Sequence, residues 1–145
     1  MFDKRLNTAW WVLRIGFGLG PILAGLDKYF NILTQWAMYL NPLVPRITHL
    51  RPETFMHVVG VVEIAAGILV LSGRFTRIGS YVVMLWLWGI AANLLTTGLF
   101  LDVAVRDIEI SLGVFALAKL TEVRQSVAVK TPSSLKHTVT QKAIA

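Results

Sequence analysis

The sequence predicts an all-α integral membrane protein, an antiparallel up-down four-helix bundle with a short extracytoplasmic amphipathic segment. Its 145 residues are 55% hydrophobic and only 15% charged, with a mean hydropathy of +0.64. Ordinary soluble domains carry about 25% charged residues. Four apolar runs also approach the ~20 residues that a helix needs to cross about 30 Å of hydrocarbon. The chain is therefore expected in a membrane, with the lipid bilayer as its first partner.

The four predicted spans are placed at about Leu6–Leu26, Thr54–Leu71, Ile78–Thr97 and Val103–Leu120. The turn Ser72–Arg77 joins the second and third spans and is too short for anything but an antiparallel hairpin. The start of the fourth span is less sharply marked, because several charged residues lie there: Asp102, Arg106, Asp107 and Glu109. Residues 1–124 are thus expected to form one four-helix transmembrane domain.

The segment between the first two spans, Asn31–Pro52, contains three prolines and continues neither helix. Within it, apolar residues recur at helical spacing, which predicts a short amphipathic helix at the membrane surface. These residues are Leu33, Trp36, Ala37 and Leu40. At the other end of the chain, residues 125–145 are polar, basic and without periodicity, so we expect a disordered cytoplasmic tail.

The placement of lysine and arginine predicts the orientation. With an even number of spans, both termini share a side with the central turn, and basic residues are concentrated on that side. It holds Lys4, Arg5, Arg74, Arg77, Lys119, Arg124, Lys130, Lys136 and Lys142, against Lys28, Arg46 and Arg51 on the other. Both termini should therefore be cytoplasmic, in a bacterial-type inner membrane. Arg14 interrupts the first apolar run, so this run is expected to be a retained helix and not a cleaved signal peptide.

Glu63 is a carboxylate within the apolar run Phe55–Leu71. An acid at the centre of a membrane helix costs about 2.5–3.5 kcal/mol, so it is retained where something offsets that cost. Small and polar residues share its helix face, and similar stripes on the other spans predict a bundle with a polar centre. The stripes are Arg14, Gly18, Pro21, Gly25 and Lys28; Gly60, Glu63 and Gly67; Gly79, Trp86, Gly89 and Asn93; and Asp107, Ser111, Val114 and Ala118.

A rise of ~1.5 Å per residue places Arg14 and Glu63 near the middle of the membrane, with Asp107 shallower. The sequence therefore predicts that Arg14 lies between the two carboxylates and that Lys28 closes the extracytoplasmic end. Trp86 is deep enough to pack in the core or to line a flat apolar pocket. The candidate cofactor-binding residues are Arg14, Lys28, Glu63, Trp86, Asn93 and Asp107. The alternative is that the buried charges only hold the helices in register.

The composition disfavours several kinds of site. The chain has no cysteine, which excludes disulfides, thiolate metal sites and an intrinsic thiol relay. His49 and His137 lie outside the spans and His57 points away from the Glu63 stripe, so neither haem nor a metal site is expected. The net charge of +6 collects at the ends of apolar runs, and no nucleic-acid partner is expected. Any redox group must be a bound carrier or belong to a partner protein.

Several motifs together carry a resemblance: Arg14, Gly25–Lys28, Pro45, Gly60–Leu69 followed by Gly73–Arg77, and Arg106–Asp107. Over about residues 10–121 the chain resembles the DoxX family of small four-helix membrane proteins. The glycine-flanked glutamate followed by the Gly-Arg turn is the most specific part. The resemblance implies a four-helix bundle and a redox role, because a namesake member is a subunit of a thiosulfate:quinone oxidoreductase and others are associated with thiol-oxidant defence. The absence of cysteine weakens that redox implication here.

Three functional classes remain open. The first is a small subunit of a membrane oxidoreductase complex that binds a quinone-like lipophilic carrier at the Arg/Glu/Asp core. The second is a non-enzymatic assembly or scaffold protein whose polar core fixes a bundle for a partner. The third, a small proton-coupled transporter, is disfavoured because four short helices leave only a narrow path unless the protein oligomerises. A protein partner or a homo-oligomer in the membrane is expected.

Single introduced cysteines test the predicted topology. Because the native chain has no cysteine, Lys130→Cys and Arg46→Cys each create one reactive site. With four spans, we expect a membrane-impermeant thiol reagent to reach the two sites from opposite sides of the membrane. Labelling of both sites from the same side contradicts the four-span topology.

Overall fold

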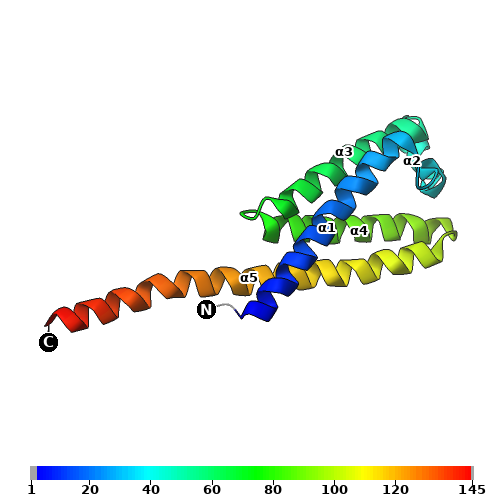
Figure 1. Cartoon of the computed structure of the whole chain (residues 1–145). Helices are drawn as coiled ribbons and strands as arrows, with labels where there is room; N and C mark the ends of the chain where they lie inside the picture. The colour runs from blue at the N-terminus through cyan, green and yellow to red at the C-terminus, as the bar shows by residue number, and fades with distance from the viewer. Residues whose placement is uncertain (1–2, 145) are drawn as a thin grey trace.

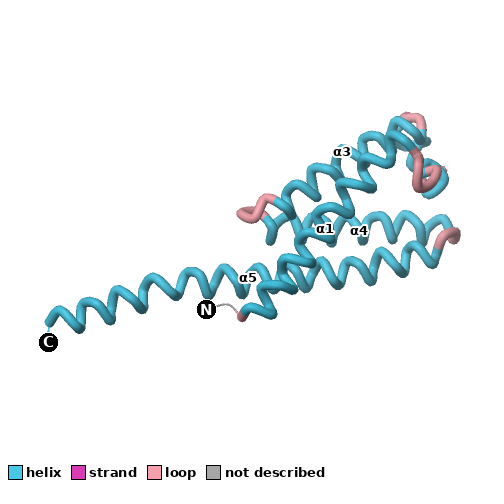
Figure 2. The backbone as a smooth tube through the Cα atoms, viewed as in Figure 1, coloured by secondary structure: helices cyan, strands magenta, loops and turns pink. Residues whose placement is uncertain are grey.

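The computed structural model describes residues 3–144, with side chains described through Ala128, and this part of the chain is helical without strands. Four long helices make up most of it: α1 (Lys4–Phe30), α3 (Pro52–Leu71), α4 (Thr76–Thr97) and α5 (Leu101–Ile144) (Figure 1). Between α1 and α3 lie the 3-10 helix η1 (Trp36–Tyr39) and the short helix α2 (Leu43–Thr48). Figure 2 shows that short loops make the connections.

The long helices form two pairs. α1 packs along α3 and α4 packs along α5, while α3 also contacts α4 and the first half of α1 crosses α5 (Figure 1). The start of α1 and the α3–α4 turn around Gly73 lie at one end, which we call the turn end. η1, α2 and the α4–α5 turn lie at the opposite end, which we call the loop end.

Among the described residues, three helices are long and apolar enough to cross a membrane, namely α1, α3 and α4. They match the first three predicted spans. α5 begins at Leu101, two residues before the predicted start at Val103, and continues past Leu120 without a break. Charged residues recur along α5, so its crossing of the membrane stays a prediction.

The helix also runs through most of the segment 125–145, which the sequence predicts to be a disordered tail. For residues 129–144 the structure describes the backbone course alone, and Ala145 lies outside the described residues. The boundary between a transmembrane domain and a cytoplasmic tail therefore stays a prediction.

Glycines bring α1 and α3 into close contact. A Cβ added to Gly60 would lie 2.6 Å from the carbonyl oxygen of Gly25, and one added to Gly67 would lie 2.5 Å from that of Gly18. Small residues let two helix backbones approach in this way, and only glycine fits such short separations. The predicted stripes on these two helices are confirmed, because Gly18, Gly25, Gly60 and Gly67 are buried against one another.

The predicted inward stripes are confirmed on α5 and wrong in part on α4. The α5 stripe, Asp107, Ser111, Val114 and Ala118, is buried throughout. On α4, however, Gly89 is exposed and has no atom within 4 Å of an added Cβ. At about 100° per residue, Gly89 lies about 80° around the helix from Gly79, whereas Val83 stays within about 40° of it and is buried.

The predicted amphipathic helix on Leu33, Trp36, Ala37 and Leu40 is wrong in its extent, because over these residues only Trp36–Tyr39 forms a short 3-10 helix. The chain leaves α1 through Asn31, which adopts a left-handed φ of 50°. Asp27 then accepts hydrogen bonds from the backbone N–H groups of Ile32 and Leu33, at 3.0 and 3.1 Å. A side chain that binds nearby backbone donors competes with helix formation, so a loop replaces the helix.

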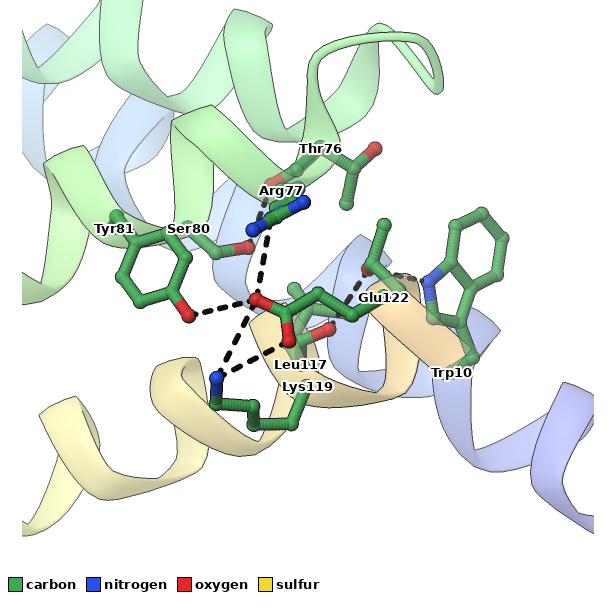
Figure 3. Close-up of polar contacts among 9 residues, drawn as sticks. Trp10, Thr76, Arg77, Ser80, Tyr81, Leu117, Lys119 and Glu122 are labelled. Atoms are coloured by element: carbon green, nitrogen blue, oxygen red, sulfur yellow. Dashed lines mark hydrogen bonds and ion pairs between the residues drawn. The ribbon is translucent and has the colours of Figure 1, made fainter. Parts of the chain in front are cut away.

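At the turn end, Glu122 joins α4 to α5 (Figure 3). Its carboxylate accepts a hydrogen bond from the Tyr81 hydroxyl at 2.9 Å and pairs with Arg77 and Lys119, each at 3.1 Å. The hydrogen bonds from Lys119 and Tyr81 hold the pKa of Glu122, which lies beyond the predicted fourth span, below its usual range. The contacts of Glu122 therefore stabilise the fold at pH values above the pKa of Glu122 in the unfolded chain. This stabilisation is lost as the pH falls through the lower pKa of Glu122 in the folded protein.

Alanine at two glycines distinguishes a helix contact from an open face. Gly60→Ala places a methyl group against the Gly25 carbonyl, so we expect a loss of about 1–3 kcal/mol in the free energy of unfolding. Gly89→Ala is the matched control, because it adds the same methyl group to an open helix face, and it should stabilise by up to about 1 kcal/mol. Unfolding of the detergent-solubilised protein measures both. Equal stability of the two variants would show that the α1–α3 contact is wrong.

Candidate functional site

A buried ion pair lies at the centre of the candidate site. The Lys28 Nζ atom of α1 lies 2.6 Å from the Glu63 Oε2 atom of α3, and the two side chains are only 3% and 7% exposed. Helical side chains lean towards the N-terminus of their helix, so Lys28 reaches back along α1, and its ammonium also lies 3.5 Å from the Ala24 carbonyl. The close α1–α3 approach brings this ammonium to the middle of α3.

Two tryptophans complete the surroundings of the pair. The Trp86 indole N–H of α4 donates to the second oxygen of Glu63 at 3.4 Å, a long hydrogen bond. The Lys28 ammonium lies 3.7 Å from the centre of the Trp36 ring, in cation–π geometry. Lys28 therefore has a carboxylate and an aromatic face as partners, and Glu63 has partners from two other helices.

Asp27 links this arrangement to the loop that follows α1. It is buried, and besides the backbone N–H groups of the loop it accepts the indole N–H of Trp36 at 2.7 Å. Asp27 thus fixes the ring against which the Lys28 ammonium lies. We name the five residues Asp27, Lys28, Trp36, Glu63 and Trp86 the polar centre.

Asp107 of α5 is buried beside the polar centre. It interacts electrostatically with Lys28 and with Glu63, and its carboxylate pairs with the neighbouring Arg106 at 3.7 Å. The Arg106 side chain is 64% exposed, so this pair is a weak, partly solvated one. The four long helices therefore each place at least one polar side chain in or beside the centre.

The predicted pairing of Arg14 with Glu63 and Asp107 is wrong. The Arg14 guanidinium donates to the carbonyl oxygens of Val70, at 3.3 Å, and of Leu71, at the C-terminal end of α3. Because Gly18 lies against Gly67 in the antiparallel α1–α3 pair, Arg14 is level with the end of α3 and not with its middle. Its side chain also leans towards the start of α1, away from Glu63. Arg14 thus binds carbonyls that have no partner within their helix.

Asn93 also lies apart from the polar centre. Its side-chain amide donates to the Tyr39 carbonyl at 2.7 Å and accepts from the backbone N–H of Asn41 at 3.1 Å. Asn93 therefore holds the loop of η1 against the end of α4. Of the six candidate residues, the structure brings together Lys28, Glu63 and Trp86, with Asp107 beside them, and separates Arg14 and Asn93.

The sequence did not single out Asp27 as a site residue, and it indicated only a position at the membrane surface for Trp36, without its contacts with Asp27 and Lys28. Asp27 precedes Lys28 at the end of the first apolar run, and an acid there, followed by a non-helical segment, signals a side chain that binds the turning backbone. No local signal showed that Trp36 folds back over Lys28, because that contact depends on the course of the loop.

The polar centre is internally satisfied. Among the described side chains, no buried nitrogen or oxygen lacks a hydrogen-bond partner. Two surface grooves of about 500 and 300 Å³ lie at the turn end, and neither is lined by Lys28, Glu63 or Trp86. The predicted binding site for a lipophilic carrier, between Trp86 and a cluster of Arg14, Glu63 and Asp107, does not form in this arrangement. The centre instead joins α1, α3, α4 and the loop through one charged pair.

Removal of one charge tests how much the pair contributes. Lys28→Met leaves Glu63 buried without its cation, so we expect a loss of about 3–5 kcal/mol in the free energy of unfolding, less whatever protonation of Glu63 recovers. The double variant with both Lys28→Met and Glu63→Leu should recover much of the stability that Lys28→Met alone loses. Arg14→Ala is the comparison, and its loss should be about 1–2 kcal/mol, because it removes hydrogen bonds to carbonyls and cation–π contacts with Trp10 and Trp11 but leaves no buried charge unpaired. A larger loss for Arg14→Ala than for Lys28→Met contradicts this assignment.

The comparisons with known proteins agree with the sequence motifs. No curated protein and no solved structure matches the sequence. The DoxX family model matches residues 9–97, which include Asp27, Lys28, Trp36, Glu63 and Trp86. This match covers more than half of the chain and contains the entire polar centre. The protein is therefore a member of the DoxX family, with apolar helices suited to a membrane.

Proposed function

We propose that this protein is a small non-catalytic subunit of a membrane oxidoreductase complex, in which it acts as a scaffold. The observation that carries the scaffold role is the buried Lys28–Glu63 pair, joined by Trp86 and fully partnered within the chain. A centre in which every buried polar side-chain atom has a partner within the chain holds helices in one arrangement. The oxidoreductase complex is inferred from the family resemblance.

The outward faces supply the area that a scaffold needs. Large apolar side chains are exposed along each long helix, for example Val12, Val61, Leu85 and Leu112, which are 57–64% exposed. In a bilayer such faces contact either lipid tails or the helices of another subunit. We place the chain in a bacterial-type inner membrane with both termini cytoplasmic, on the basis of the basic residues at the turn end.

A second candidate function is contact with a quinone-like carrier at Glu63 and Trp86. The specific observation in its favour is the 3.4 Å hydrogen bond from the Trp86 indole to Glu63, which is longer than the 2.6 Å contact of Glu63 with Lys28. A hydroxyl or carbonyl of a carrier could replace this weak hydrogen bond while the aromatic ring supplies contact area. Arg14 takes no part in this version of the site.

Recovery of partners tests the scaffold role. The protein is purified with a mild detergent from its native membrane, as the unmodified chain and as Lys28→Met, and the proteins that accompany it are identified by mass spectrometry. We expect another subunit of an oxidoreductase complex to accompany the unmodified chain. Its recovery should fall at least severalfold with Lys28→Met, because the distorted helices no longer hold their outward apolar faces in the arrangement that the partner binds. Gly89→Ala is the control and should retain the partner. Unchanged recovery with Lys28→Met contradicts the role of the polar centre.

Titration with a soluble quinone analogue separates the two candidates. If the protein is a scaffold alone, tryptophan fluorescence should show no saturable change. If the carrier binds at Glu63, saturable quenching appears, and Trp86→Phe weakens binding by roughly five- to tenfold through the loss of one hydrogen bond. Trp88→Phe is the matched control, because Trp88 bonds to Ser111 and is 56% exposed. Saturable binding that both substitutions weaken equally would exclude the Glu63–Trp86 site.

A further inference from the structure

We propose that the groove between α1 and α5 at the turn end binds the phosphate of an anionic phospholipid headgroup. The groove has a volume of about 300 Å³. The residues that matter for the argument are Trp10, Trp11, Arg14, Gly73 and Arg124, all of which line it. This site is separate from the polar centre and does not depend on the scaffold role.

Two guanidinium groups share one aromatic ring in this groove. The central carbon of Arg124 lies 4.0 Å from the centre of the Trp10 ring, and that of Arg14 lies 4.9 Å from it. Arg124 also donates to the Asn7 side chain at 2.5 Å, and Arg14 donates to carbonyls at the end of α3. These neutral partners and the Trp10 ring hold both cations in place.

Neither arginine has a carboxylate partner. Among the described residues, the ion pairs involve Lys28, Arg77, Arg106 and Lys119, and neither Arg14 nor Arg124. The two guanidinium groups interact repulsively with each other. Each has five N–H donors, of which the contacts above use only some. Two neighbouring cations that lack an anion favour a phosphate group, which can accept hydrogen bonds from both.

The surroundings favour a lipid as the source of that phosphate. Trp11 lies in the groove and is 43% exposed, as suits an aromatic side chain at headgroup level. Val12 and Ile15 follow on α1 and are exposed, so acyl chains attached to the phosphate would meet apolar surface. The second groove, with Arg74 and Arg77, adjoins the first at Gln125 and adds positive charge. Anionic lipids are attracted to such basic clusters at the cytoplasmic face.

Binding to the full chain in a neutral detergent tests the proposal. The probes are short-chain phosphatidylglycerol, phosphatidylcholine of the same chain length, and inorganic phosphate, with tryptophan fluorescence as the measurement. We expect saturable binding of phosphatidylglycerol that is at least tenfold tighter than that of the other two. Equal affinity for the two lipids, or for inorganic phosphate and phosphatidylglycerol, overturns the assignment.

Two matched substitutions locate the site. Arg124→Gln removes one groove cation and should weaken phosphatidylglycerol binding by about five- to tenfold, which is the effect of roughly 1 kcal/mol per basic residue. Arg5→Gln removes one charge from the same end outside the groove and should change the affinity less than twofold. Equal effects of the two substitutions would indicate general attraction to the basic end and would refute a groove site. Helical content of both variants is compared by circular dichroism, and Arg124→Lys, which retains the charge, should restore most of the binding.

Discussion

The ion pair between Lys28 and Glu63 is the interaction on which the arrangement of the other elements depends. An acid in the middle of an apolar helix is costly unless a cation reaches it, and here the cation comes from the neighbouring helix. It can reach because Gly25 and Gly60 let α1 and α3 approach to backbone contact. Trp86 then connects the pair to α4, and Trp36, held by Asp27, covers the ammonium from the loop. One charged contact thus links four elements.

The partly buried Arg14 has a different role at the opposite end. Its guanidinium supplies donors to the last carbonyls of α3, which no helical N–H can reach. Gly73, with a φ of 76°, allows the chain to turn directly beside this guanidinium. The close contact between Arg14 and Gly73 gives a physical role to the Gly-Arg turn of the DoxX resemblance. The turn accommodates an arginine from α1 as well as reversing the chain.

The polar centre and the groove at the turn end therefore differ in chemical character. In the polar centre, the Lys28 and Glu63 charges are paired and buried, as expected of a group that determines structure. At the turn end, Arg14 and Arg124 lie against an open groove without a carboxylate partner. The proposed scaffold role belongs to the first arrangement and the proposed lipid contact to the second. A small membrane subunit can combine both, because lipid at one end leaves the lateral faces free for another protein.

The sequence by itself determined the membrane class, the positions of α1, α3 and α4 and the glycine stripes that face each other, because apolar length and helical periodicity are local properties. It also singled out Lys28, Glu63 and Trp86, which belong to the polar centre. Only the tertiary structure decided which cation pairs with Glu63. That choice depends on the register of two antiparallel helices and on the lean of long side chains towards the N-terminus, which place Lys28 at Glu63 and Arg14 at the end of α3. The position of Trp36 was likewise decided by the course of a loop, which no periodic pattern encodes.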